Sequence, residues 1–227
     1  ARAPPDRGIR AQGPALSAPS IDRSAARHAS SRAAASYADA AVLAREVEMR
    51  MRERLQYMKL EPARILDAGC GEGHGAKRLA ERYPDAQVVG LDFAYPMLRA
   101  AIGRDAWLRR LFRRRRIDYL CADLACVPLP AASVDLAWSN LALHCVDDPQ
   151  PVLKELRRVL KVGGLLMFSC YGPDTLKELK GAFAARDATR IPHRVVEVEY
   201  DFRVLAAERV ADDVVHLLLA AGAHAAR

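Results

Sequence analysis

The sequence predicts an α/β fold with a mostly parallel, doubly wound sheet and helices on both faces. Apolar strand-like runs alternate with helical runs from residue 63 to residue 186, which is typical of a parallel sheet. A glycine-rich turn joins the first strand of this series to its first helix. Polar residues also follow four of the strands at their carboxyl ends. Ligands bind at that edge of open α/β sheets, so the pattern also predicts where a site should lie.

Each element follows from its own pattern. Apolar residues recur at helical spacing over residues 37–58, and Pro62 ends that helix before the first strand. Gly163 and Gly164 are typical of a stop after a helix. The apolar positions of the first helix are Val42, Leu43, Val47, Met51, Leu55 and Met58. Beyond it we expect strands at 63–68, 87–92, 117–121, 134–139 and 164–170, and helices at 74–82, 96–103, 149–160 and 174–186.

The last part of the chain departs from this alternation. Apolar and charged residues alternate over 196–204, which predicts a half-exposed strand, and an amphipathic helix is expected over 206–221. The chain therefore divides into four parts. They are a disordered N-terminal extension (1–30), an N-terminal helical segment (31–61), the α/β domain (62–190) and an atypical C-terminal segment (191–227).

The composition limits the classes of protein to which the chain can belong. With 227 residues, 51% of them hydrophobic, the chain forms one domain with extensions. No apolar run approaches the roughly 18 residues of a membrane helix. The five cysteines form no C-x-x-C pair, so no metal site is expected. They are instead typical of small buried side chains in a reducing compartment, the cytoplasm. The Arg-rich first 30 residues resemble a transit peptide, but a bias of the coding sequence explains them more simply.

Asp67 indicates which ligand the glycine turn holds. Glycine stands at every second position over residues 69–75, where backbone can lie against a ligand. Part of this run also fits the fingerprint of a dinucleotide site. The carboxylate of Asp67 would repel a pyrophosphate, but it suits a cofactor that carries an ammonium and a sulfonium. We therefore favour S-adenosylmethionine over NAD.

Two further acids follow strands at the same edge. Asp92 ends the second strand, where an acid can accept hydrogen bonds from both ribose hydroxyls of a cofactor. Asp123 follows the third strand and could accept the adenine amino group. The alternative for Asp67, Asp92 and Asp123 is that they are helix caps or loop acids.

Four stretches resemble the class I S-adenosylmethionine-dependent methyltransferases, and the likeness covers about residues 37–183. They are residues 31–37 leading into 41–47, residues 65–71, residues 139–144 with 147–148, and residues 168–180. The last two are most similar to the BioC group, the malonyl-[acyl-carrier protein] O-methyltransferases of biotin synthesis. The resemblance implies a Rossmann-like fold with an N-terminal lid. Family members usually have glutamine where Ala44 stands, and their fold ends in a pair of antiparallel strands. With one strand expected after residue 190, that pair looks incomplete and residues 164–170 form an open edge.

The resemblance also implies a set of cofactor-binding residues. Asp67, Gly69, Gly71 and Gly73 would cradle the methionine part of S-adenosylmethionine, and Asp92 would hold the ribose. The other positions carried over are Phe93 and Met97 beside the adenosine, Asp123 and Leu124 around the adenine, Asn140 beside the methionine part, and Tyr37 on the lid.

The implied reaction is methylation of the free carboxylate of malonyl on an acyl carrier protein. A carboxylate is ionised at neutral pH, so alignment matters more than acid–base chemistry. His144 and Tyr171 lie past strands four and five, and we interpret them as donors that orient the substrate, although a packed loop histidine is an alternative for His144. Other readings are a methyltransferase acting on another small molecule, or an assembly or binding protein on this scaffold without turnover.

The net charge of +7 favours acidic partners, and no membrane partner is expected. Much of the excess lies in one arginine run, made of Arg109, Arg110, Arg113, Arg114, Arg115 and Arg116. Acyl carrier proteins are acidic, so this run could speed their docking. A solvated loop is the plainer alternative. Nucleic acid is disfavoured, because few aromatic residues are interleaved with the arginines.

Overall fold

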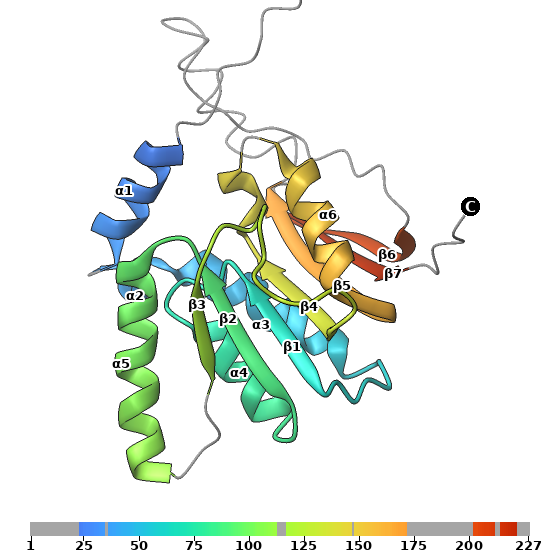
Figure 1. Ribbon diagram of the computed structural model, residues 1–227, viewed down its shortest axis with the longest axis horizontal. Coiled ribbons are helices and arrows are strands. Elements are labelled where there is room, and N and C mark those ends of the chain that lie inside the picture. The colour runs from blue at the N-terminus through green and yellow to red at the C-terminus, as the bar shows by residue number, and fades with distance from the viewer. Residues whose placement is uncertain are drawn as a thin grey trace, which may run out of the picture.

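A computed structural model describes residues 23–34, 36–112, 117–146, 148–171, 202–211 and 214–221. Within these residues, seven strands form one sheet in the order β3-β2-β1-β4-β5-β7-β6. The predicted doubly wound sheet is confirmed (Figure 1). Five strands run parallel: β1 (Arg64–Ala68), β2 (Gln87–Asp92), β3 (Asp118–Cys121), β4 (Val134–Asn140) and β5 (Leu160–Tyr171). Two are antiparallel to β5 or to each other: β7 (Val214–Ala221) pairs with β5, and β6 (Phe202–Ala211) pairs with β7.

Helices cover both faces of the sheet, because residues alternate between the faces along each strand. On one face, α6 (Pro149–Val159) packs Leu153 and Leu156 onto Leu66 of β1. On the other, Met51 of α3 (Val42–Leu55) and Leu79 of α4 (His74–Arg82) share a core cluster that includes Ile65 of β1. The remaining helices are α1 (Arg23–Ala33), α2 (Tyr37–Ala40), α5 (Tyr95–Phe112) and the short 3-10 helix η1 (Leu143–Cys145).

The strand order reverses beside β1, which pairs with β2 on one side and β4 on the other. Chains that leave the carboxyl ends of such strands diverge and open a crevice there. The loops after β1, β2, β3 and β4 meet at this edge. The N-terminal segment α1–α3, which we call the lid, lies over it (Figure 1).

The C-terminal prediction was wrong in one respect. A helix was expected over 206–221, but residues 206–211 lie in β6 and residues 214–221 form β7. The run 214–221 is apolar almost throughout, and periodicity cannot separate a short buried strand from a helix in such a run. The register with β5 decides it, from Leu165 opposite Ala220 to Tyr171 opposite Val214. The expected open edge at 164–170 is therefore paired, and the strand pair is present.

Smaller differences concern the ends of elements. Residues 23–30, expected to be disordered, lie in α1, and the helix expected over 37–58 is two helices, α2 and α3. Val42 and Leu43, predicted as core positions, are 66% and 50% exposed. The helix expected to end at residue 103 continues to Phe112. Gly163 and Gly164 lie inside β5, because α6 ends earlier, at Val159. The helix expected at 174–186 and the first part of the strand expected at 196–204 lie outside the described residues.

Candidate active site

The glycine turn after β1 brings backbone of the α/β domain against the loop after β4. Gly69 has a φ of +81°, and a β-carbon there would lie 2.3 Å from the β-carbon of Ala142. Only glycine satisfies both conditions, because other L-residues are strained in this conformation and would also clash. The turn is also fixed by its neighbour β2, since the amides of Gly69 and Cys70 donate to the carbonyl of Leu91.

Asp67 is a deeply buried acid of the site, 3% exposed at the carboxyl end of β1. Its carboxylate accepts a hydrogen bond from the amide of Ala76 in the first turn of α4. The start of α4 lies very close to this carboxylate, since a β-carbon on Gly75 would lie 2.9 Å from Oδ2 of Asp67. Burial raises the pKa of Asp67 to about 7, and the nearby carboxylates of Glu48 and Asp92 add to the shift. Asp67 therefore accepts a hydrogen bond at the start of a helix, which agrees with the alternative that it is a helix cap. It is also an acid within reach of a cavity.

Asp92 ties the glycine turn to the loop after β2. Its Oδ2 accepts from the amide of Gly71 at 2.9 Å and its Oδ1 from the amide of Ala94 at 2.8 Å. Burial raises its pKa, although these hydrogen bonds to the ionised form oppose the shift. A carboxylate has about four acceptor sites, so these backbone bonds and a third from Phe93 leave capacity for a ligand hydroxyl. Asp123 likewise closes a turn, its Oδ1 accepting from the amide of Ala125 at 2.8 Å.

A cavity of about 340 Å³ opens between the carboxyl edge and the lid. Its size is within the range of small-molecule and cofactor sites. Most of the predicted site residues line it together, from the carboxyl ends of β2, β4 and β5, the segments after β1 to β4, and the lid. They are Gly69, Gly71, Asp92, Phe93, Met97, Asp123, Leu124, Asn140, His144, Tyr171 and Tyr37.

A second compartment of about 90 Å³ shares Gly69, Gly71 and Asn140 with the first. The acidic residues on its lining are buried, since Glu48, Asp67 and Glu72 are each at most 7% exposed. Basic side chains on its lining are more open, with Arg104 51% and His74 42% exposed. Among the described residues, Oε1 of Glu72 has no hydrogen-bond partner. The compartment therefore suits a cationic group placed inward and an anionic group placed outward.

Asn140 links the core to the lid. Its Nδ2 donates to the carbonyl of Ala44 in α3 at 2.8 Å, and its Oδ1 accepts from the hydroxyl of Ser169 at 2.8 Å. Ser169 in turn accepts from the amide of Leu141 at 3.0 Å, which is aimed there by a positive φ of 47°. Both ends of the Asn140 amide are thereby oriented.

His144 and Tyr171 stack at the far wall of the larger cavity. Their ring centroids are 4.3 Å apart and the rings are tilted by 49°. Burial raises the pKa of the Tyr171 phenol, and it also raises the pKa of Tyr37 on the lid. Both hydroxyls are therefore protonated at neutral pH.

Two predicted groups lie apart from the cavities. Gly73 lines neither compartment, and its α-carbon instead faces Tyr119, whose hydroxyl would be 2.6 Å from an added β-carbon. Arg109 and Arg110 lie in the last turn of α5 rather than in a loop, while residues 113–116 lie outside the described part. The 18 residues of α5 extend about 27 Å away from the carboxyl edge where the helix begins, so these arginines are remote from the cavity opening (Figure 1).

The cysteines divide into two groups. Cys70 and Cys170 are buried as expected, whereas the other three are exposed. Cys121 lies in the edge strand β3, Cys126 in a loop and Cys145 at the end of η1. Within the described residues, no group of three or more His, Cys, Asp or Glu side chains could hold a metal ion. The same residues contain no helix with the length and apolar character needed to span a bilayer.

Sequence reasoning missed several lining residues. Ala26 and Ser30 of α1 line the larger cavity, and Arg45 and Glu48 of α3 line the smaller one. Glu48 follows Val47, which is the first buried position of the apolar stripe on α3. The one sign in the sequence that Glu48 belongs to the site was a charged residue beside this stripe. The resemblance implied an N-terminal lid, but nothing in the sequence indicated which residues of this helix would face the glycine turn.

The comparisons with known proteins agree with this geometry. Residues 66–168 match the family described as "Methyltransferase domain". Over 167 residues, 74% of this chain, the sequence is 54% identical to a malonyl-[acyl-carrier protein] O-methyltransferase of Gallionella capsiferriformans. Over 180 residues, 78% of this chain, it is 49% identical to the enzyme of the same name in Laribacter hongkongensis. These alignments cover 58% and 60% of the two relatives, so the chain spans less than two thirds of their length.

Solved structures support the fold alone. A methyltransferase from Aquifex aeolicus, described as SAM dependent, aligns with a TM-score of 0.56 at 17% identity, covering 88% of this chain and 98% of that one. A protein from Pyrococcus horikoshii OT3 aligns with a TM-score of 0.58 at 23% identity, covering 78% and 89%. Residues 66–168 therefore match the methyltransferase domain family, and the sheet topology confirms the doubly wound fold that the sequence predicts.

Proposed function

We propose that this chain binds S-adenosylmethionine and uses it to methylate the free carboxylate of malonyl-acyl carrier protein. The observation that carries the proposal is the 54% identity to a relative of that name over 167 residues, 74% of this chain. The two compartments supply a physical reason for the cofactor, because acids line the smaller one where a cationic amino acid moiety would lie.

The charges of the smaller compartment give the cofactor one orientation. The ammonium group would lie inward beside Asp67 and Glu48, whereas the carboxylate would point outward toward Arg45. The adenosine would then occupy the larger cavity, with Asp92 at the ribose and Asp123 and Leu124 at the adenine. Gly69 and Gly71 form the floor that joins the two parts.

When bound, S-adenosylmethionine supplies an electrophilic methyl group on its sulfonium sulfur. The acceptor is a carboxylate, which is already ionised at neutral pH, so no residue of the chain has to remove a proton. The residues instead hold the acceptor oxygen in line with the methyl group and exclude water. Alignment of this kind can contribute on the order of 7–11 kcal/mol to lowering the barrier.

His144 and Tyr171 are suited to hold the acceptor. They stack at the wall of the larger cavity, and the phenol of Tyr171 is a protonated donor at neutral pH because burial raises its pKa. Tyr37 on the lid adds a second protonated phenol over the same cavity. These groups can donate hydrogen bonds to one carboxylate oxygen and leave the other free to attack.

A methyl-transfer assay with isotopically labelled S-adenosylmethionine tests the proposal. Malonyl-acyl carrier protein should gain one methyl ester, which mass spectrometry of the carrier detects, and free malonyl thioesters should react more slowly. His144→Ala and Tyr171→Phe should each lower kcat/KM for the malonyl carrier. Methylation of free acids but not of the carrier would favour a small-molecule methyltransferase, and cofactor binding without turnover would favour a scaffold protein.

Docking of the acidic carrier is the finer part of the proposal. The arginine run is one basic segment, but its first residue, Arg109, lies about 21 Å along α5 from the carboxyl edge where the helix begins. Arg27 and Arg32 of α1 are exposed and lie on a helix that lines the larger cavity. Substitution of each arginine pair by glutamate tests separately whether each surface docks the carrier. The pair that docks the carrier should raise KM for malonyl carrier and leave KM for a free malonyl thioester unchanged. No effect from either pair would reject docking through these arginines.

A further inference from the structure

The loop between β3 and β4 carries part of the cofactor cavity. Asp123 and Leu124, at its start, line the larger compartment. Two turns make the next residues rigid, because the amide of Ala125 donates to Oδ1 of Asp123 at 2.8 Å and the amide of Cys126 donates to the carbonyl of Asp123 at 2.9 Å. The position of Asp123 therefore depends on where the chain is held at residue 127.

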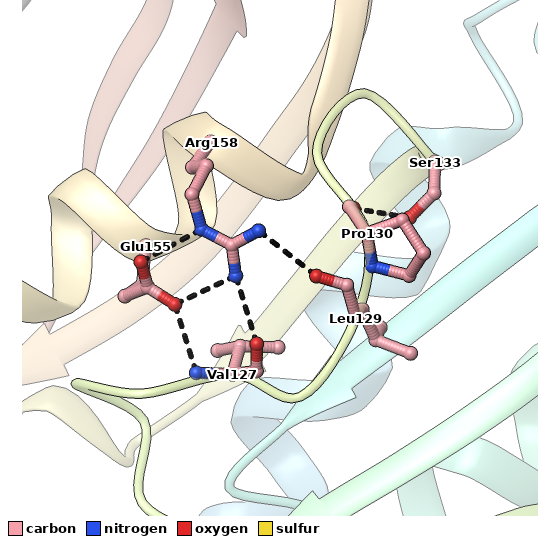
Figure 2. Close-up of polar contacts among 6 residues, drawn as sticks. All are labelled: Val127, Leu129, Pro130, Ser133, Glu155 and Arg158. Carbon is pink, nitrogen blue, oxygen red and sulfur yellow. Dashed lines mark hydrogen bonds and ion pairs between the residues drawn. The ribbon is translucent and has the colours of Figure 1, made fainter.

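Two side chains of α6 hold the loop at that point (Figure 2). Oε2 of Glu155 accepts from the amide of Val127 at 2.9 Å. Arg158 donates from Nη2 to the carbonyl of Val127 at 2.8 Å and from Nη1 to the carbonyl of Leu129 at 2.9 Å. Three backbone groups of the loop are thus satisfied by one helix 28 to 31 residues further along the chain.

The same two side chains brace one another. Nε of Arg158 donates to Oε1 of Glu155, and Nη2 donates to Oε2, both at 2.8 Å. The planar guanidinium supports this two-point contact and still has donors directed at the loop. An ion pair as exposed as this one, with side chains 38% and 21% exposed, stabilises a fold little by its charge alone. What distinguishes it is the backbone that it contacts.

The helix that carries the pair is rigidly placed. Leu153, Leu156 and Val159 of α6 are fully buried, and Val127 packs into the same cluster at 3% exposure. We infer that Glu155 and Arg158 are positioning residues for the adenine end of the cleft, because they fix the loop that presents Asp123 and Leu124. This inference rests on the proposed cofactor. It extends the site to a helix face that lines neither of the two cavities.

Binding measurements with two ligands test this role. S-adenosylhomocysteine carries both the adenosine and the amino acid part, whereas methylthioadenosine carries the adenosine alone. Arg158→Lys keeps the charge but removes the planar fork, and Glu155→Gln keeps the shape but removes the charge. Both variants should raise Kd by roughly tenfold, and by the same factor for both ligands, because each lost or weakened hydrogen bond changes binding by about 0.5–1.5 kcal/mol. Calorimetry well below the unfolding temperature measures this effect.

Ser133→Ala is the matched control. Its hydroxyl donates to the carbonyl of Pro130 at 2.7 Å in the same loop, but the bond is local (Figure 2). It should leave both Kd values unchanged. A purely structural role for the pair predicts a lower Tm with unchanged Kd values, and that result would overturn the inference. So would weaker binding of S-adenosylhomocysteine with normal binding of methylthioadenosine. If the unmodified protein binds neither ligand, the proposed cofactor itself is rejected.

Discussion

At the scale of single residues, Asp67 is the most informative group. It is buried among Glu48 of α3, Asp92 of β2 and the first turn of α4, with His74 and Arg45 on the same compartment. Burial raises its pKa to about 7. Without a ligand it is therefore partly protonated at neutral pH, and a cationic ligand would favour the ionised form. Ligand binding and proton release are linked at this residue.

This linkage predicts a pH-dependent affinity for S-adenosylmethionine. Below about pH 7 the Asp67 proton must leave before the cation binds, so Kd should rise by up to about tenfold for each unit of decreasing pH. Above about pH 7 the affinity should become level. Asp67→Asn should bind weakly at all pH values and lose this dependence. Calorimetry in buffers of different ionisation enthalpy would also detect the released proton, and a flat profile in the unmodified protein would contradict the prediction.

The same pKa has the opposite consequence for the ligand-free fold. Between the ordinary pKa of 3.8 and about 7, folded Asp67 binds a proton that the unfolded chain has already released. The free energy of unfolding contributed by this residue therefore falls as the pH rises through that window, and it changes no further above it.

Gly69 gives a second prediction at this scale. Gly69→Ala would place a β-carbon 2.3 Å from that of Ala142 and would hold alanine at a φ of +81°. We expect a loss of about 2–4 kcal/mol in the free energy of unfolding from strain and overpacking together. Ala142→Gly should recover only part of the loss, because it removes the clash and leaves the strained backbone. Urea denaturation of the two single variants and the double variant measures both parts, and full recovery would show that φ is unimportant.

At the scale of elements, the attachment of α3 to the core decides whether the cleft is closed. The bond from Asn140 to the carbonyl of Ala44 depends on Ser169, which fixes the orientation of the amide. Ser169→Ala should loosen α3 and raise its amide hydrogen exchange by roughly tenfold, the effect of about 1–1.5 kcal/mol. KM for S-adenosylmethionine should rise in parallel.

Ser139→Ala provides the control for this element. Ser139 is equally buried and donates to the carbonyl of Ala68 at 2.9 Å, but it does not join the contact between Asn140 and α3. Exchange over α3 should therefore stay normal in this variant. If the amide hydrogens of α3 exchanged at equal rates in the two variants, Ser169 would not have the role assigned to it.

At the scale of the whole molecule, the sheet separates two cores. Leu156 of α6 belongs to the cluster on one face and Leu79 of α4 to the cluster on the other, and both are fully buried. Each substitution to alanine should cost about 2–5 kcal/mol. Because the sheet lies between them, the double variant should be additive within about 0.5 kcal/mol. Leu66 and Leu156, which share one cluster, should depart from additivity. Urea unfolding of these variants checks the layered architecture, and strong coupling across the sheet would contradict it.

Much of the fold could be predicted because its signals are local. The helix expected at 74–82 and the strand expected at 87–92 coincide with α4 and β2, since the glycine turn precedes the helix, Pro84 follows it and an apolar run forms the strand. The acids at the ends of β1, β2 and β3 could also be read from the sequence, and the fold brings Asp92 and Asp123 to the larger cavity and Asp67 to the smaller one. Glu48 and Arg45 could not be found this way, because their relation to Asp67 depends on the packing of α3 over the turn.

The sequence by itself determined the alternating strands and helices, the glycine turn and the acid that favours a cationic ligand, because each depends on residues close together in the chain. Tertiary structure decided three other features: residues 214–221 form a strand beside β5, Glu48 of the lid joins Asp67, and the arginines at the end of α5 lie far from the cleft. The physical reason is that strand pairing, burial and charge all depend on neighbours that are distant in sequence, and only the folded chain brings those neighbours together.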